Sequence, residues 1–273
     1  MKVKELFDIK GKVVVITGGA GILGSEIARG LAELGSKVVI CDIRNYDSVA
    51  QKLSSLNLKV EGYYMDALDL ESIRKTHEKI YDKFGRVDVL INAAGGNMKE
   101  ATVSPELEFF DIPFDALEKV VALNLFGGAI LPSQIFGKTM AKNENGGSII
   151  NISSMAAFRP LTRVVGYSAA KAAVSNFTQW LAVHFAFEYN KKLRVNAIAP
   201  GFFLTNQNRY LLLDENGNLT TRGKAIIDHT PMGRFGNPEE LIGACVWLIS
   251  DAASFVTGTV IPIDGGFSAF SGV

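Results

Sequence analysis

One segment near the N-terminus indicates the fold: Lys12-Val-Val-Val-Ile-Thr-Gly-Gly-Ala-Gly-Ile-Leu-Gly24. Its first half is a short β-branched run, and its glycine-rich second half opens a helical pattern over Ile22–Leu34. Glycines let the backbone turn tightly, and a helix N-terminus offers free N–H groups and the positive end of the helix dipole. A strand, a glycine-rich turn and a helix in this order predict a cradle for a pyrophosphate.

The alternation of short apolar runs with longer helical patterns continues along the whole chain. The predicted strands are Lys12–Thr17, Lys37–Asp42, Lys59–Met65, Val87–Ile91, Ser148–Ile152, Arg194–Ile198 and Thr259–Ile263. The predicted helices are Ile22–Leu34, Asp47–Leu56, Leu70–Phe84, Asp115–Ala141, Ala169–Tyr189 and Pro238–Ser250. This order is typical of βαβ units and predicts an α/β protein, a doubly wound parallel sheet of the Rossmann type with about seven strands and helices on both faces.

Composition excludes several classes of protein. The chain has 273 residues, 48% of them hydrophobic and 21% charged, and no low-complexity linker, so we expect one domain spanning 1–273. Its 28 basic and 28 acidic residues leave no net charge, which argues against nucleic-acid and membrane partners. The sequence shows neither a signal peptide nor an apolar run approaching the roughly 20 residues of a membrane helix. We therefore expect a soluble cytoplasmic protein.

The sequence predicts no metal site. Its two cysteines, Cys41 and Cys245, are too few for a disulfide framework and lack metal-ligand spacing. The three histidines, His77, His184 and His229, are too widely separated to suggest a shared ligand set.

The segment 202–237 breaks the alternation of strands and helices. It carries no strand signal, and the polar turn Asp214-Glu-Asn-Gly-Asn218 precedes a short helical piece at Thr220–His229. Long irregular segments inside a compact domain are often active-site lids or binding loops. We expect a substrate lid inserted after the sixth strand, the alternative being a surface excursion without function.

An acidic residue at the end of the second strand predicts the cofactor. Asp42, followed by Ile43, lies eighteen residues beyond Gly24, near the spacing of a carboxylate that hydrogen-bonds the adenosine ribose. The same carboxylate would repel the extra phosphate of NADP by roughly 4 kcal/mol at 4 Å and an effective dielectric constant near 20. Arg44 partly offsets this repulsion, and we expect NAD to be preferred over NADP.

Three residues with fixed spacing predict acid–base chemistry. Ser154 follows the fifth strand, Tyr167 lies thirteen residues later, and Lys171 is four residues further, on the same helix face as Tyr167. A tyrosine hydroxyl titrates near pH 10, and a nearby ammonium favours its phenolate, so we expect Lys171 to lower the pKa of Tyr167. Tyr167 could then exchange a proton with a carbinol or carbonyl oxygen that Ser154 positions.

These motifs together resemble those of the short-chain dehydrogenase/reductase family over essentially the whole length. The resemblance rests on Thr17-Gly-Gly-Ala-Gly-Ile-Leu-Gly24, Asp66, Asn92-Ala-Ala-Gly95, Asn124, Ile152-Ser-Ser154, Tyr167-Ser-Ala-Ala-Lys171, Pro200-Gly201 with Thr205, and Asp264-Gly-Gly266. It departs from the family pattern at Ile22, where a glycine is usual, which puts the detailed pyrophosphate contacts in question.

The resemblance implies hydride transfer between a nicotinamide and an alcohol or ketone, without a metal. It implies catalytic roles for Ser154, Tyr167 and Lys171, with Asn124 holding a water in a proton relay. It implies that Asp66 contacts the adenine and that Pro200 to Thr205 hold the nicotinamide. The full set of expected cofactor-binding residues is Gly18, Gly21, Ile22, Leu23, Gly24, Asp42, Ile43, Asp66, Ala67, Asn92, Ala93, Ala94, Gly95, Tyr167, Lys171, Pro200, Gly201, Phe203 and Thr205.

Within the family, the loop after the fourth strand, the lid and the C-terminus are similar to those of the D-mannonate oxidoreductases (fructuronate reductases) of hexuronate breakdown. A sugar acid needs several hydroxyl partners and a cation for its carboxylate. The expected substrate residues are Gly96, Asn97, Ser154, Met155, Arg163, Asn206, Asn208 and Arg209, with either arginine as the cation.

Other functions and an assembly state remain open at this point. A gluconate or polyol dehydrogenase would also need a polar substrate pocket and is the nearest alternative. A 3-oxoacyl-carrier-protein reductase would want NADP, which Asp42 disfavours, and a non-catalytic nicotinamide-binding protein usually lacks the tyrosine or lysine. The resemblance also implies a homotetramer, with one interface on the helices Asp115–Ala141 and Ala169–Tyr189.

Overall fold

A seven-stranded parallel sheet forms the centre of this computed structural model, which describes residues 2–205 and 209–272. The strands are β1 Val13–Thr17, β2 Lys37–Asp42, β3 Val60–Tyr64, β4 Val89–Asn92, β5 Gly147–Ile152, β6 Leu193–Pro200 and β7 Val260–Ile263. Their order is β3-β2-β1-β4-β5-β6-β7, and all six pairings are parallel. The order reverses direction between β1 and β4, which confirms the predicted doubly wound α/β fold.

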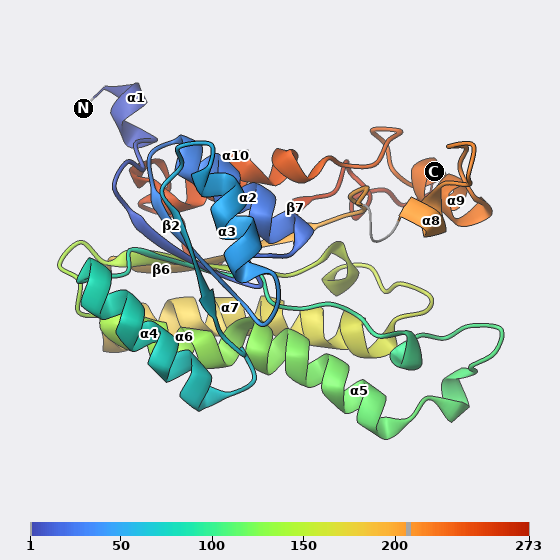
Figure 1. Cartoon of the computed structure of the whole chain (residues 1–273). Helices are drawn as coiled ribbons and strands as arrows, with labels where there is room; N and C mark the ends of the chain where they lie inside the picture. The colour runs from blue at the N-terminus through green and yellow to red at the C-terminus, as the bar shows by residue number, and fades with distance from the viewer. Residues whose placement is uncertain (1, 206–208, 273) are drawn as a thin grey trace.

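Helices cover both faces of the sheet (Figure 1). The α-helices are α1 Val3–Leu6, α2 Ile22–Glu33, α3 Tyr46–Ser54, α4 Leu70–Phe84, α5 Phe114–Val121, α6 Leu131–Met140, α7 Val165–Glu188, α8 Arg209–Leu212, α9 Thr221–Asp228 and α10 Ile242–Ile249. The shorter or irregular helices are η1 Lys99–Ala101, η2 Phe109–Asp111, η3 Ala122–Ile130, η4 Met155–Ala157, η5 Pro238–Leu241 and η6 Asp251–Ala253. Helices α2, α3 and α10 lie on one face, and α4, α5, α6 and α7 lie on the other.

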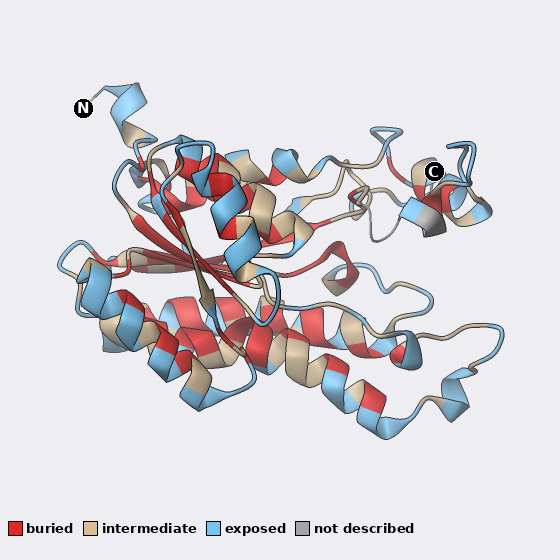
Figure 2. Ribbon diagram, viewed as in Figure 1, coloured by how far each residue is buried: buried red, intermediate tan, exposed pale blue. Residues whose placement is uncertain are grey.

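The central strands are buried on both faces, as their nearly continuous apolar sequences predict (Figure 2). Side chains alternate along β1, so Val14 and Ile16 pack into the core beneath α2 and α10, while Val15 packs into the core beneath α4 and α6. Both cores are therefore built from the same strands, and the sheet is held rigidly between two helical layers.

The helix expected over 115–141 consists of three joined segments, α5, η3 and α6, of which η3 is a π-helix. By length and composition, Phe114–Met140 could cross a membrane, contrary to the sequence expectation that no segment approaches that length. Half of its most apolar window is buried inside the fold, where Phe136 and Met140 are fully covered. Its apolar character is therefore explained by packing against α7 and the sheet.

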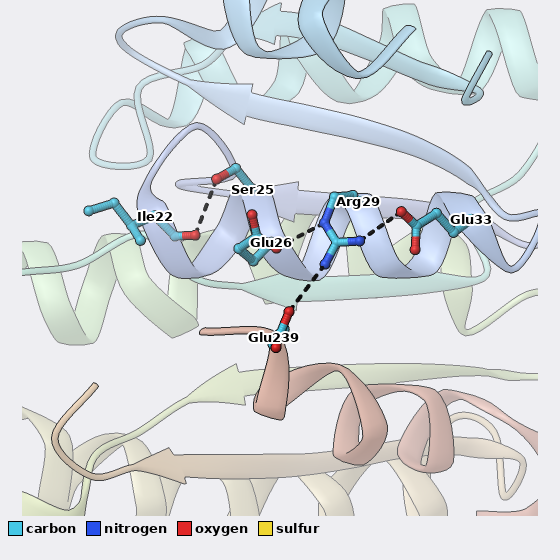
Figure 3. A network of polar contacts seen from close by, with 6 residues as sticks. All are labelled: Ile22, Ser25, Glu26, Arg29, Glu33 and Glu239. Carbon is cyan, nitrogen blue, oxygen red and sulfur yellow. Dashed lines mark hydrogen bonds and ion pairs between the residues drawn. The ribbon is translucent and has the colours of Figure 1, made fainter. Parts of the chain in front are cut away.

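Charged side chains join α2 to η5, which lies far along the chain (Figure 3). Arg29 on α2 lies 2.7 Å from Glu33 and 2.9 Å from Glu26, and it reaches Glu239 of η5 at 4.0 Å. Hydrogen bonds to Glu33 and Glu26 raise the pKa of Arg29. This guanidinium is thus surrounded by three carboxylates.

A buried chain of polar side chains anchors α6 and α7 to the sheet. Asn92 and Asn151 are register partners at the ends of β4 and β5, and the Asn92 amide donates to Asn151 at 2.8 Å and to Ser133 of α6 at 3.0 Å. The Asn151 amide donates in turn to the Thr178 hydroxyl of α7 at 2.9 Å. All four residues are buried, so water cannot reach them, and these side chains satisfy one another's hydrogen-bonding groups instead.

Replacing Thr178 by valine should destabilise the protein while preserving the shape of its core. Valine keeps the volume but leaves the buried Asn151 amide without its acceptor, so we expect a loss of about 1–3 kcal/mol in the free energy of unfolding. Denaturant unfolding followed by far-UV circular dichroism measures this loss. Thr162→Val, at an exposed position, is the control and should change the value by less than about 0.5 kcal/mol. Equal stability of the two variants would show that the polar network contributes nothing.

Candidate active site

A groove of about 500 Å³ opens at the carboxyl ends of the strands, where the strand order reverses. It is lined by Gly18, Gly21, Ile22, Leu23, Gly24, Asp42, Ile43, Met65, Asp66, Ala67, Ala93, Ala94, Gly95, Gly96, Leu123, Ile152, Tyr167, Lys171, Gly201, Phe202, Phe203 and Thr205. The residues singled out in the sequence as a phosphate cradle, an acidic strand end and a tyrosine–lysine pair therefore share one cavity.

The glycine-rich turn lies directly against the chain that follows β4. Gly18 has a φ of +62°, and a Cβ added there would lie 2.6 Å from the Ala94 backbone. A Cβ on Gly24 would lie 2.6 Å from the Gly18 carbonyl oxygen. Only glycine fits these two positions, and the N-terminus of α2 consequently faces the groove.

The unusual Ile22 has a simple structural explanation. Gly21 is the N-cap of α2 with a φ of −68°, and Ile22 is the first residue of the helix. A first helical residue has ordinary helical backbone angles, so this position needs no glycine. The turn therefore ends one residue before Ile22, and the Ile22 side chain contributes to the groove wall.

The Asp42 carboxylate ties the end of β2 to the glycine-rich turn. One of its oxygens accepts a hydrogen bond from the Ala20 N–H at 3.2 Å, and the other accepts from the Arg44 N–H at 3.2 Å. At the end of β3, Asp66 accepts from the Leu68 N–H at 2.9 Å. Both carboxylates line the groove and are held in place by backbone donors.

The expected cofactor residues line the groove with two exceptions, Asn92 and Pro200. Asn92 is fully buried and directs its amide toward α6 and β5, while Pro200 lies buried at the end of β6. Strand alternation explains Asn92, because successive side chains point to opposite faces of the sheet. Sequence reasoning missed Met65, Leu123, Ile152 and Phe202, and Gly96 lines this groove although it was expected only at the substrate.

Tyr167 and Lys171 line the groove, and Ser154 lies next to Tyr167. Lys171 is only 4% exposed, and its Nζ donates to the Ile152 carbonyl oxygen at 2.7 Å. The same Nζ lies 5.7 Å from the centre of the Tyr167 ring. The Ser154 hydroxyl accepts from the Ala156 N–H at 3.1 Å, and it is close enough to Tyr167 to lower the pKa of that phenol.

The pKa of Tyr167 differs from the sequence expectation. Burial raises it above its ordinary value, and only the Ser154 hydrogen bond acts in the opposite direction. Burial also lowers the pKa of Lys171 to about 8. Both groups are removed from water, so desolvation disfavours the charged form of each, and it outweighs the attraction that their sequence spacing suggested.

Asn124 holds the loop after β4. Its side-chain oxygen accepts from the Gly96 N–H at 3.1 Å, and its amide donates to the carbonyl oxygens of Gly96 at 2.6 Å and Val120 at 2.8 Å. It lies on the π-helix η3, a type of irregularity that is frequent at functional sites. A Cβ on the neighbouring Gly95 would lie 2.8 Å from the Asn124 side-chain oxygen and 3.3 Å from Lys171 Nζ. Asn124 and Lys171 therefore both lie close to Gly95.

The expected substrate residues are distributed unevenly. Met155 is buried in the core, and the Asn97 amide donates to the Thr102 hydroxyl at 2.7 Å. Arg163 and Arg209 are exposed. Asn206 and Asn208 lie outside the described residues. No group of three or more His, Cys, Asp or Glu side chains that could hold a metal ion occurs within 2–205 and 209–272.

Comparison with known proteins gives matches along nearly the whole chain. A family model described as enoyl-(acyl carrier protein) reductase matches residues 18–268. The uncharacterized oxidoreductase UxuB of Bacillus subtilis is 46% identical over 97% of this chain and 98% of its own length.

Two solved structures with bound cofactors have the same fold. One, from Haemophilus influenzae, holds NAD and has the provisional name D-mannonate oxidoreductase; it is 44% identical, with a TM-score of 0.90 over 97% of this chain and 98% of that one. The other is a gluconate 5-dehydrogenase from Burkholderia cenocepacia with NADP and tartrate, 28% identical, with a TM-score of 0.84 over 98% of this chain and 100% of that one.

The comparisons agree with the groove geometry on the type of protein. They span both the phosphate cradle and the tyrosine–lysine pair. The chain belongs to the short-chain dehydrogenase/reductase family, and it is a nicotinamide-binding oxidoreductase that acts on CH–OH groups.

Proposed function

We propose that this protein is an NAD-dependent oxidoreductase that interconverts the secondary alcohol and the ketone of a sugar acid, with D-mannonate and D-fructuronate as the preferred pair. The observation that carries the reaction is that Tyr167 and Lys171 line the groove together, with Ser154 next to Tyr167. The substrate is supported by the provisional name of the Haemophilus structure, which is similar over nearly the whole chain.

The groove fits a dinucleotide. The close packing of Gly18 and Gly24 leaves backbone N–H groups and the N-terminus of α2 facing the cavity, where a pyrophosphate is favoured. Asp42 would hold the adenosine ribose, Asp66 and Ala67 the adenine, and the segment 200–205 the nicotinamide. When bound, the cofactor supplies or accepts the hydride.

Asp42 supports NAD over NADP. Its carboxylate accepts two backbone N–H groups and lines the groove, and it would repel the 2′-phosphate of a bound NADP. The Haemophilus structure holds NAD, whereas the Burkholderia gluconate 5-dehydrogenase holds NADP. Both cofactors therefore occur with this fold, and we propose that the Asp42 carboxylate selects NAD in this protein.

In the direction of reduction, we propose that Tyr167 donates its proton to the substrate carbonyl oxygen. Its raised pKa keeps the phenol protonated, which is the form needed to give a proton. The Ser154 hydroxyl would hydrogen-bond the same oxygen and fix its position. Lys171 Nζ would stabilise the negative charge left on the phenolate oxygen. Asn124 would hold the loop at Gly96 and bind a water behind Lys171.

We propose that residues 1–273 form one nicotinamide-binding domain and that 202–237 act as its substrate lid. The described part of this segment is ordered by local bonds: the Asp214 carboxylate accepts from the N–H groups of Asn216 and Asn218, and Leu213 pairs with Leu219. Gly96, Asn97, Ser154 and the lid would bind the hydroxyl groups of the substrate.

A gluconate 5-dehydrogenase is the second candidate, favoured by the structure that holds tartrate. It would use the same groove and the same acid–base residues. A non-catalytic nicotinamide-binding protein is disfavoured, because Tyr167 and Lys171 line the groove and Ser154 lies next to Tyr167.

We further propose a cytoplasmic homotetramer. Helix α7 presents Trp180, which is 56% exposed and stacks on His184, and Phe187, which is 81% exposed. A cavity of about 900 Å³ lies between α6 and α7, and Trp180 and His184 line it. Large exposed apolar patches commonly mark interfaces, and a second copy of the chain would cover this one.

Absorbance at 340 nm tests the reaction directly. With NADH and D-fructuronate we expect rapid turnover, with slower turnover of 5-ketogluconate, D-fructose or a 3-oxoacyl thioester. Tyr167→Phe should lower kcat by roughly 10²–10⁴, because the proton donor is lost while the shape of the ring is kept. Activity only with a neutral ketose or the thioester would contradict the sugar-acid substrate, and full activity of the Tyr167→Phe protein would contradict the mechanism.

Replacing Asp42 by serine should shift the cofactor preference. Removing the carboxylate removes roughly 4 kcal/mol of repulsion toward a 2′-phosphate, so the ratio of kcat/KM for NADH to that for NADPH should fall by up to about 10³-fold. Initial rates at fixed substrate with each cofactor measure the ratio. Asp47→Ser, on the exposed surface of α3, is the control and should leave the ratio unchanged. An unchanged ratio in Asp42→Ser would exclude this carboxylate as the selector.

The buried Lys171 should make stability depend on pH. Its pKa is about 8 in the folded protein and near 10.5 when unfolded, so between these values the unfolded chain binds more protons and stability rises with pH. Lys171→Met lacks this dependence. The melting temperature of the variant relative to the parent should therefore be highest below pH 8 and decline toward pH 10.5. A difference that stays constant with pH would show that the ammonium is not disfavoured by burial.

A further inference from the structure

Two serines that do not line the groove hold the backbone of Lys171. The Ser153 hydroxyl donates to the Lys171 carbonyl oxygen at 3.2 Å, and the Ser175 hydroxyl donates to the same oxygen at 3.1 Å. The two hydroxyl oxygens lie 2.7 Å apart, so they also hydrogen-bond each other. One hydroxyl proton can thus bond the carbonyl oxygen while the other links the two serines.

The tip of the Lys171 side chain is fixed by the residue next to Ser153. Lys171 Nζ donates to the Ile152 carbonyl oxygen at 2.7 Å, and Ile152 is the last residue of β5. Ser153 follows it, is 1% exposed, and donates its N–H to the Ile198 carbonyl oxygen of β6 at 2.8 Å. Two consecutive residues at the end of β5 therefore hold both the backbone and the amine of the lysine.

The sequence spacing explains why these side chains face one another. Ser175 lies one turn after Lys171 on α7, and Thr178 follows on the same face of the helix. Asn151 and Ser153 are two residues apart, so their side chains point to the same side of the sheet. Asn151 bonds Thr178, and Ser153 bonds Ser175. Of these two pairs, the second is the one that reaches Lys171.

We propose that Ser153, together with Ser175, is a positioning residue of the reaction, because it fixes the backbone of Lys171 so that Nζ stays beside Tyr167 and Gly95. This inference rests on the acid–base role proposed for Lys171 and extends it to two residues outside the groove. A lysine amine sits on a flexible four-carbon stem, so a defined position of Nζ requires a fixed backbone. A displacement of about 1 Å in such a group can lower a rate by roughly 10²-fold.

Alanine variants of the two serines test the proposal. With the substrate that the parent reduces fastest, Ser153→Ala and Ser175→Ala should each lower kcat by roughly 10- to 100-fold. The double variant should lose less than the product of the two single losses, because the hydroxyls act on one carbonyl oxygen. Ser175→Thr keeps a hydroxyl that can bond the carbonyl one turn back, and it should retain the kcat of the parent.

The control is Thr178→Val, which breaks the neighbouring pair on the same face of α7. It should lose stability, as argued above, and leave kcat nearly unchanged. An equal loss of kcat in Thr178→Val and Ser153→Ala would show that general support of α7 matters rather than the position of Lys171, and would overturn the proposal.

A second background separates positioning of Lys171 from any other effect of Ser153. Lys171→Met should lower kcat by roughly 10²–10⁴. In that background Ser153→Ala should cause no further loss, because the group that it positions is gone. A loss that is as large as in the parent background would contradict the proposal, and so would full activity of Ser153→Ala.

Acetylation of Lys171 by acetic anhydride gives a readout that needs no turnover. Mass spectrometry of chymotryptic peptides measures its rate relative to that of Lys119, which is exposed on α5. We expect faster modification of Lys171 in Ser153→Ala and Ser175→Ala, because the released amine reaches water, and the parent rate in Thr178→Val. Equal rates in all variants would overturn the proposal, whichever substrate the protein uses.

The outcomes distinguish this proposal from the proposed function. If Lys171→Met loses activity and Ser153→Ala does not, the acid–base role stands and the positioning role is wrong. If Lys171→Met keeps full activity, or if the parent reduces none of the substrates, the proposed function is wrong in that respect. The acetylation rates then decide whether the two serines hold the lysine.

Discussion

The contact between the backbone of Gly18 and that of Ala94 is the constraint on which the groove depends. Strands β1 and β4 are neighbours in the sheet, and the Ala94 N–H donates to the Thr17 hydroxyl at 3.2 Å. Beyond this point the two segments separate, one toward α2 on one face and the other toward the loop that Asn124 holds. A side chain at position 18 would push them apart. The crevice therefore forms where the strand order reverses. The contact between Gly18 and Ala94 fixes the two segments that form its walls.

The sequence contained enough information for the sheet and for most of the groove. Each strand is a short apolar run, and the glycine turn at Gly18 with the strand-end acid Asp42 has a fixed place in a βαβ unit. Other features depend on tertiary structure. Leu123 lines the groove from η3, where a π-helix interrupts a regular helical pattern, and this leaves no periodic or motif-like signal. The motif also did not show that the Asn92 side chain is buried and directed toward α6 and β5.

Burial affects the pKa values of Tyr167 and Lys171 more strongly than attraction between the two groups does. Residue spacing alone suggested that the Lys171 ammonium would make Tyr167 more acidic, but both side chains are withdrawn from water. The result is a protonated phenol beside an amine whose pKa of about 8 lies close to neutral pH. Tyr167 holds its proton more strongly than a free phenol, and Lys171 holds its proton more weakly than a free amine. One proton donor and one ready proton acceptor suit a reaction that runs in both directions. The hydrogen bond from Lys171 Nζ to the Ile152 carbonyl oxygen fixes the amine at the end of β5.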